Sequence, residues 1–194
     1  MKKKLLSISL AVIVAVMAIS GASLAWLQDT TDTVTNTFTE GRVAIDLYEH
    51  EYDLATNKLT ETVTRTGVNN YKLVPGDILP KDPTVVVKAN SEACYLFVKI
   101  EKSANVDTFL TYAIANGWTK LEGVEGIVYY REVAASTNDQ PFAVLDGNKV
   151  TVKNTITMKD MEDNTSNPTF AFTAYAIQKA NTGDAAAAWA LIAK

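Results

Sequence analysis

Few residues in this chain can do acid–base or nucleophilic chemistry, because its 194 residues include one histidine and one cysteine. A catalytic serine or cysteine needs a base beside it, and the only histidine, His50, lies in a run of charged and aromatic residues. That run, residues 48–52, is typical of a solvated strand end or loop, so we predict no catalytic role for His50. A single histidine also excludes a zinc site built from paired histidines of one chain.

The single cysteine begins a run of alternating apolar residues, which are Cys94, Leu96, Val98 and Ile100. This alternation predicts that Cys94 is a small buried hydrophobic residue with an unreactive thiol. The alternative is a disulfide between exported subunits, since one cysteine cannot form a disulfide within its own chain.

One segment is rich in oxygen-bearing side chains and could hold Ca²⁺, namely Asp160, Glu162, Asp163 and Asn164. Its spacing does not match the EF-hand loop, so a solvated turn is the preferred interpretation and a calcium site is the alternative. The nine glycines are scattered and form no phosphate-binding loop ahead of a helix. We therefore predict no catalytic residue, no metal site and no cofactor.

Residues 1–25 have the pattern of a secretory signal peptide. Three lysines follow Met1, an apolar run continues to residue 19, and small residues occupy positions 23 and 25. We expect a signal peptidase to recognise Ser23 and Ala25, to cleave after Ala25 and to leave Trp26 as the first mature residue. The alternative is a retained membrane anchor, which needs roughly 20 apolar residues where this run has about 15.

The charge of the mature chain argues against two classes of partner. Loss of the three signal lysines changes the net charge from −4 to −7. Nucleic acids and anionic lipids bind clustered Lys and Arg, so we expect neither to be a partner. We expect a secreted protein that does not associate with the membrane after cleavage.

Short segments of alternating apolar residues predict an all-β fold. The alternating sets are Val43, Ile45 and Leu47, then Cys94 to Ile100, then Val150, Val152, Ile156 and Met158. Residues 58–66 place threonines on one face, which predicts an outer or edge strand. Residues 169–178 are apolar on both faces, which predicts a central strand covered on both sides. Together these segments favour a jelly-roll-like antiparallel β-sandwich.

Turn residues separate the predicted strands. Pro75-Gly76 fits a type II turn, and Asp146-Gly147 predicts a hairpin between residues 142–145 and residues 149–158. Residues 78–83 contain two prolines and are predicted to be a connection, because proline cannot donate to a strand ladder.

One or two short helices are expected within the β fold. Apolar residues recur at helical spacing through residues 106–114, with Asn105 as the cap and Gly117 as the stop. Residues 184–193 are rich in alanine, which has the highest helix propensity. We expect this second helix to dock on one edge or end of a sheet, and a subunit contact is the alternative.

The mature chain divides into a leader and one domain. Residues 26–40 are polar and rich in threonine and aspartate, with too few apolar residues to form a core. Residues 41–194 hold all the predicted strands and are expected to form the β-sandwich domain.

Three groups of residues carry a family resemblance. At the start, Ala25-Trp26-Leu27-Gln28-Asp29-Thr30 is followed by Asn36-Thr37-Phe38-Thr39-Glu40-Gly41 and a strand. The middle holds Leu73-Val74-Pro75-Gly76-Asp77, and the end holds Phe172-Thr173-Ala174-Tyr175-Ala176-Ile177-Gln178 with Ala188-Trp189-Ala190-Leu191 after it. In this order, they resemble the TasA/camelysin-type exported proteins of Gram-positive biofilms.

The resemblance implies a signal peptidase of the SipW type, a jelly-roll sandwich and extracellular fibres that strengthen a biofilm matrix. It also implies that the leader inserts as a donor strand into the sheet of the next subunit. Val34, Asn36 and Phe38 alternate, so an added strand could place Val34 and Phe38 in pockets. Such a head-to-tail contact propagates into a filament. The expected partners are further copies of the chain, the peptidase and other matrix or cell-wall components.

Two alternative functions remain open. Camelysins have been classed as metalloproteases, although this sequence has no His-Glu-x-x-His motif. The other alternative is a monomeric surface module that binds a host or wall component through its threonine-rich face.

Overall fold

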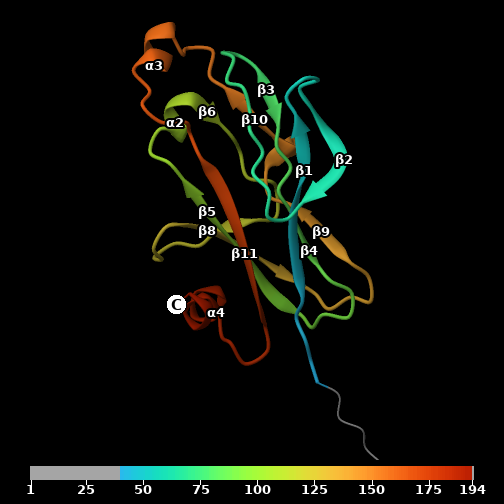
Figure 1. Cartoon of the computed structure of the whole chain (residues 1–194). Coiled ribbons are helices and arrows are strands. Elements are labelled where there is room, and N and C mark those ends of the chain that lie inside the picture. Colours follow the sequence, from blue (N-terminus) through green and yellow to red (C-terminus); the bar gives the residue numbers. More distant parts are fainter. Residues whose placement is uncertain (1–39, 194) are drawn as a thin grey trace, which may run out of the picture. The chain divides into compact units, whose positions relative to one another are not determined.

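The computed structural model describes residues 40–193, whose strands form three sheets with antiparallel pairing throughout (Figure 1). Two sheets have four strands each, and the third has three. This arrangement confirms the predicted all-β antiparallel sandwich.

The first four-stranded sheet has the order β2-β1-β4-β9. Its strands are β1 (Ile45–Asp53), β2 (Lys58–Thr64), β4 (Thr84–Val87) and β9 (Gln140–Ala143). The first part of β1 pairs with β4, from Ile45 opposite Val87, whereas the pairing with β2 extends from Glu49 to Asp53. β2 lies at the edge, as its threonine-rich face predicted.

The second four-stranded sheet has the order β11-β5-β8-β7. Its strands are β5 (Cys94–Lys102), β7 (Thr119–Lys120), β8 (Ile127–Val133) and β11 (Phe170–Gln178). β11 pairs with β5 over nine residues without a register shift. The prediction of a central strand for residues 169–178 is therefore wrong within the described chain, since β11 is an edge strand. Its two apolar faces have separate explanations, because one faces the core and the other faces a helix.

The small sheet has the order β3-β10-β6 and consists of β3 (Ile78–Pro80), β10 (Lys149–Val152) and β6 (Leu110–Thr111). β3 corrects the prediction that residues 78–83 form only a connection. Its three residues pair with β10 at the sheet edge, where the missing N–H of Pro80 is tolerated.

The described helices are α2 (Val106–Phe109), α3 (Met158–Glu162), α4 (Ala185–Ile192) and the 3₁₀ turn η1 (Asp146–Asn148). The three α-helices exceed the one or two expected, because α3 begins at Met158, the predicted end of a strand, and continues into residues 160–162, for which a solvated turn was the preferred interpretation. The prediction of a helix through residue 114 is also wrong. The chain becomes extended at Leu110, and Thr111 pairs with Thr151 of β10.

The predicted hairpin at Asp146-Gly147 is wrong, although the turn itself is present. η1 connects β9 to β10, and these two strands belong to different sheets. β10 ends at Val152, so the strand predicted to continue to Met158 is shorter than expected. A left-handed Gly147, with φ of 61°, allows the chain to pass from one sheet to the other.

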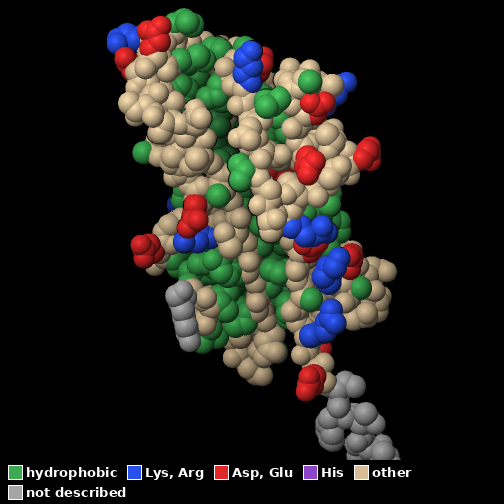
Figure 2. All heavy atoms as spheres, viewed as in Figure 1, with side chains coloured by type: hydrophobic (Ala, Val, Ile, Leu, Met, Phe, Trp, Pro, Cys, Tyr) green, Lys and Arg blue, Asp and Glu red, His purple; other side chains and the backbone are tan. Residues whose placement is uncertain are grey.

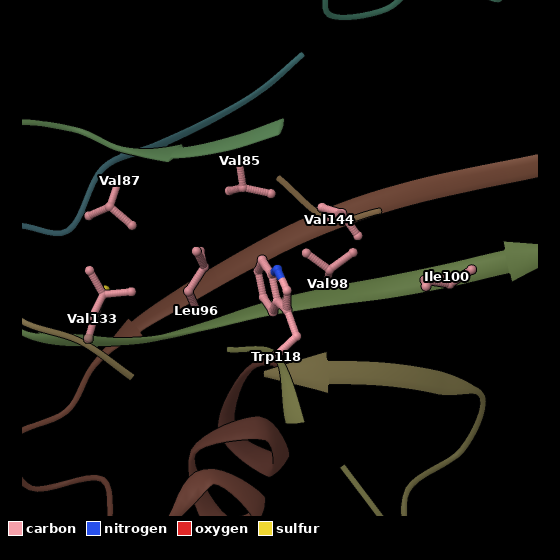
Figure 3. Close-up of a cluster of buried hydrophobic side chains, with 9 residues drawn as sticks. Val85, Val87, Leu96, Val98, Ile100, Trp118, Val133 and Val144 are labelled. Carbon is pink, nitrogen blue, oxygen red and sulfur yellow. The ribbon is translucent and has the colours of Figure 1, made fainter. Parts of the chain in front are cut away.

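The main core lies between the two larger sheets (Figure 3). β4 contributes Val85 and Val87, and β5 contributes Leu96 and Val98, all with no exposed surface. Trp118 packs among them and donates its indole N–H to the carbonyl of Ala143 at 2.8 Å. The core therefore joins residues that are far apart in the sequence.

The opposite face of the β5 sheet is covered by α4, so the predicted docking helix is present but lies on a face of the sheet and not on an edge or end. Asp184 caps this helix by accepting a hydrogen bond from the backbone N–H of Ala187 at 2.8 Å. Trp189 packs on Phe97 of β5 with ring centroids 5.2 Å apart, and edge-on against Tyr175 of β11 at 5.3 Å. α4 thus docks on β5 and β11.

Candidate functional site

Six of the predicted site residues cannot be placed. The cleavage residues and the assembly residues lie outside the described part of the chain, and they are Ser23, Ala25, Trp26, Val34, Asn36 and Phe38.

The thiol of Cys94 is fully buried and free within the core between the two larger sheets. Burial raises its pKa to about 11, because the low-dielectric core disfavours the thiolate. The prediction of a buried, unreactive cysteine is confirmed for its position.

His50 has a partner that the sequence did not indicate. Its Nδ1 lies 2.5 Å from a carboxylate oxygen of Asp82, and its backbone N–H donates to the other oxygen at 3.0 Å. The imidazole is half-buried, whereas Asp82 has only 6% of its surface exposed. Asp82 therefore holds β1 against the turn that precedes β4.

An ion pair between Lys81 and Glu49 lies beside this contact. Lys81, which is 8% exposed, donates to both carboxylate oxygens of Glu49 at 3.0 and 3.1 Å. Asn69 donates to the carbonyl of His50 at 2.9 Å and accepts from the backbone N–H of Tyr52 at 3.0 Å. The group thus joins three separate segments of the chain around the middle of β1.

The chemistry available to this cluster is limited. An aspartate and the histidine that it orients are two of the three members of a catalytic triad. The third member is a nucleophile hydrogen-bonded to the second ring nitrogen. Among residues 40–193, no hydrogen bond to Nε2 of His50 is present. The contacts of the cluster hold separate segments of the chain together.

The oxygen-rich segment at residues 160–164 forms a helix and its end. Asp160 accepts from the backbone N–H of Thr157 at 2.8 Å, while the hydroxyl of Thr157 accepts from the backbone N–H of Asp160. This reciprocal pair is a capping box at the start of α3. No group of three His, Cys, Asp or Glu side chains suited to a metal is found in the part of the chain that the structure describes.

A shallow groove of about 480 Å³ lies beside β6. Its lining includes Leu110, Tyr112, Ile114 and Tyr129, with Asp107 and Lys153 among its polar residues. The ammonium of Lys153 donates to the backbone carbonyl of Asp107, and the carboxylate of Asp107 is paired with Lys102. These charges are already satisfied within the protein.

The edges of the sheets are the remaining candidate site, because an unpaired strand edge can bind another strand. Most edges of the described sheets carry a protecting feature. β3 and β9 contain prolines, β6 and β7 have two residues each, and β2 carries Lys58 and Glu61. β11 has none of these features, since its nine residues include no proline and no charged side chain.

The protein surface along β11 also has no charged side chains from the strand itself. Figure 2 shows uncharged and hydrophobic surface over β11, with Lys, Arg, Asp and Glu side chains lying to either side. Sequence reasoning missed this site because the apolar faces of residues 169–178 suggested a central position. The signal that could have indicated it is the uninterrupted run of nine residues without a charge.

Between β1 and β11, the apolar side chains are less completely buried than those on β5. We call this region the seam. The residues of the seam pack against the main core but remain half-buried, and they are Val43, Ile45, Leu47, Phe170, Phe172, Ala174 and Ala176. By contrast, Leu96 and Val98 on the neighbouring β5 have no exposed surface. The core is therefore partly open to solvent along the seam.

One end of the seam is covered by a polar side chain. The ammonium of Lys81 lies 5.3 Å from the ring centroid of Phe172 and 5.6 Å from that of Tyr71, within cation–π range. The Lys81–Glu49 pair thus partly shields the first half of β11.

Comparison with known proteins finds no matching family model, curated protein or solved structure. Within residues 40–193, no helix is long and apolar enough to cross a membrane.

Proposed function

We propose that this protein is an exported structural subunit of the cell surface or biofilm matrix, which assembles into fibres by head-to-tail strand donation. Its signal peptide would be removed by a SipW-type peptidase, and residues 26–40 of each mature subunit would add a strand to a sheet of the next. The resemblance to the TasA/camelysin-type proteins and the alternation of Val34, Asn36 and Phe38 support this function.

The observation that carries the proposal is the contrast between β11 and the other sheet edges. An uncharged nine-residue edge without proline is a site at which another strand can pair, and proteins that remain monomeric commonly protect such edges. The leader supplies a suitable strand, because it is rich in threonine and contains neither glycine nor proline between residues 26 and 40.

Deletion of residues 26–39 tests the proposal. We expect the mature chain, residues 26–194, to form fibres visible by negative-stain electron microscopy, and the shortened chain, residues 40–194, to remain monomeric. The shortened chain should keep the β-type circular dichroism spectrum and a cooperative thermal transition, because all the described strands begin after residue 40.

A matched pair of substitutions separates strand donation from a general effect of the leader. Val34→Lys together with Phe38→Lys should abolish fibres, because two charges would enter the apolar sheet contact. Thr35→Ser with Thr37→Ser, on the alternate face of the same strand, should leave fibres intact. Fibres that persist after deletion of the leader would contradict the proposal.

A further inference from the structure

We propose that the free edge of β11 is the acceptor for residues 33–39 of a second copy of this chain. This inference rests on the proposed function, because it names the surface to which the donated strand binds. Its grounds are the composition of the sheet edges, the incomplete burial of the seam and the direction in which the chain enters the sandwich.

The edges differ in how readily they can accept a strand. Addition to β3 or β9 meets Pro80 or Pro141, whose nitrogen cannot donate a hydrogen bond. β6 and β7 offer two residues each, and the β1–β2 hairpin has a register irregularity beside an edge that carries two charges. β11 alone among the described strands combines an edge position with nine residues in unbroken register.

The core is also less completely buried beside β11. On β11, the core-facing Phe172, Ala174 and Ala176 are half-buried, although the strand belongs to the same sheet as the fully buried Leu96. Ala174 and Ala176 are small, so an added strand could place larger apolar side chains beside them. Val34 and Phe38 are such side chains, and their burial would stabilise the contact.

β1 offers a second partner on the far side of the seam. Its residues 45–48 pair only with β4, because the pairing with β2 extends from Glu49 onward. Val43, Ile45 and Leu47 contribute half-buried side chains to the same opening. Because β1 already contacts β11, an added strand would gain its backbone hydrogen bonds from β11 and apolar contacts from the half-buried side chains at this edge.

The direction of the chain favours a second copy over the chain's own leader. The backbone N–H of Glu92 donates to the carbonyl of Arg42 at 2.9 Å, and that of Lys179 donates to Ala93 at 2.8 Å. The chain therefore enters the sandwich at the end where β11 finishes (Figure 1). A leader that returned to its own β11 would have to reverse near Gly41 and would run parallel to it.

A copy placed at the other end of the sandwich satisfies the antiparallel arrangement. Its leader would enter the seam where β11 begins at Phe170 and would lie antiparallel to β11, in the pairing that is slightly more stable per residue. Seven extended residues span about 23 Å, which covers most of a nine-residue strand of about 30 Å. Each subunit would then use one end to donate and the other to accept, and the contact would not close on itself.

Disulfide trapping tests the assignment, because Cys94 is the only cysteine and can be removed by Cys94→Ala. In this background, one chain carries Thr37→Cys in the leader, and a second chain of different mass carries Thr173→Cys on the exposed face of β11. Thr35→Cys and Ala171→Cys extend the scan to a shifted register. The matched control acceptor is Thr62→Cys, which is exposed on β2. Fibres assembled from mixed chains are oxidised and resolved on a non-reducing gel.

We expect on the order of tenfold more mixed dimer with a cysteine on β11 than with Thr62→Cys, because a disulfide requires Cα atoms within about 7 Å. Fibres that form with no preference for β11 would overturn the acceptor assignment and leave strand donation standing. A cross-link within a single chain carrying Thr37→Cys and Thr173→Cys, without mixed dimers, would show that the leader fills its own edge. Failure of the unsubstituted mature chain to form fibres would contradict both proposals.

Discussion

The buried thiol of Cys94 leads to a prediction about reactivity. Its pKa of about 11 and its complete burial mean that almost no accessible thiolate is present at pH 8. We expect the native protein to resist alkylation by iodoacetamide over hours, and the protein in 8 M urea to be alkylated within minutes. Mass spectrometry of the intact chain measures both rates.

Modification of the native protein at the rate seen in urea would contradict the buried position. A covalent dimer that disappears on reduction would support the alternative of a disulfide between subunits.

The ion pair between Asp46 and Arg65 predicts a dependence of stability on pH. A hydrogen bond from Arg65, with Nε 2.9 Å from Oδ1, lowers the pKa of Asp46 below its ordinary value. The pair therefore stabilises the fold above the unfolded pKa of about 3.9, and this contribution is lost as pH falls through the lower folded pKa. Arg65 is largely exposed, so solvent screening keeps this contribution small.

Urea denaturation of Arg65→Gln at two pH values measures this effect. The free energy of unfolding should fall slightly at pH 7, and by much less at pH 2. Lys58→Gln is the control, because Lys58 lies on the same hairpin and has no ion-pair partner among the described residues. An equal loss at both pH values would refute the assignment.

Individual residues also show why part of the candidate site could not be predicted from the sequence. The burial of Cys94 followed from local alternation, which needs no knowledge of distant residues. The partner of His50 is Asp82, 32 residues further along the chain, and only the tertiary structure brings their segments together. Asp160 was likewise expected in a solvated turn, with a calcium site as the alternative, whereas its bond to Thr157 makes it part of a helix cap.

Among the elements, α4 depends most clearly on one side chain. Trp189 is 6% exposed and contacts both Phe97 and Tyr175, so Trp189→Ala should lower the free energy of unfolding by roughly 3–5 kcal/mol. Leu191 on the same helix is 55% exposed, and Leu191→Ala should change it by about 0.5 kcal/mol or less. Thermal or urea denaturation, monitored by far-UV circular dichroism, compares the stability of the two variants.

Equal effects of the two substitutions would mean that α4 does not dock through Trp189. If Trp189→Ala fails to fold, Trp189→Phe serves as the milder variant, with a smaller loss that should still exceed that of Leu191→Ala.

Element types were more predictable than their partners and ends. Alternation located β1 and β5, and alanine content located α4, because these signals are local. The same local reasoning failed at residues 110–114, where the pairing of Thr111 with Thr151 overrides the helical spacing of the apolar residues. It also placed β11 at the centre of a sheet, because a helix on one face produces the same pattern of burial as a second sheet.

For the whole molecule, fold class could be read from composition and turn residues, whereas the division into three sheets could not. Crossovers such as that through η1 leave no distinct pattern in the sequence, since the same Asp-Gly turn is common in hairpins. In the proposed assembly, the net negative charge of the chain would oppose premature contacts between subunits, and the uncharged edge of β11 would permit one directed contact.

The pairing of β5 with β11 has a consequence for the time course of folding. Cys94 lies opposite Gln178 and Lys102 lies opposite Phe170, so the paired residues are between 68 and 84 positions apart in the sequence. Because translation proceeds from the N-terminus, β5 is synthesised well before β11. Loop closure over this distance is slow compared with the formation of a local hairpin. The sandwich can therefore be completed only when nearly the entire chain has been synthesised.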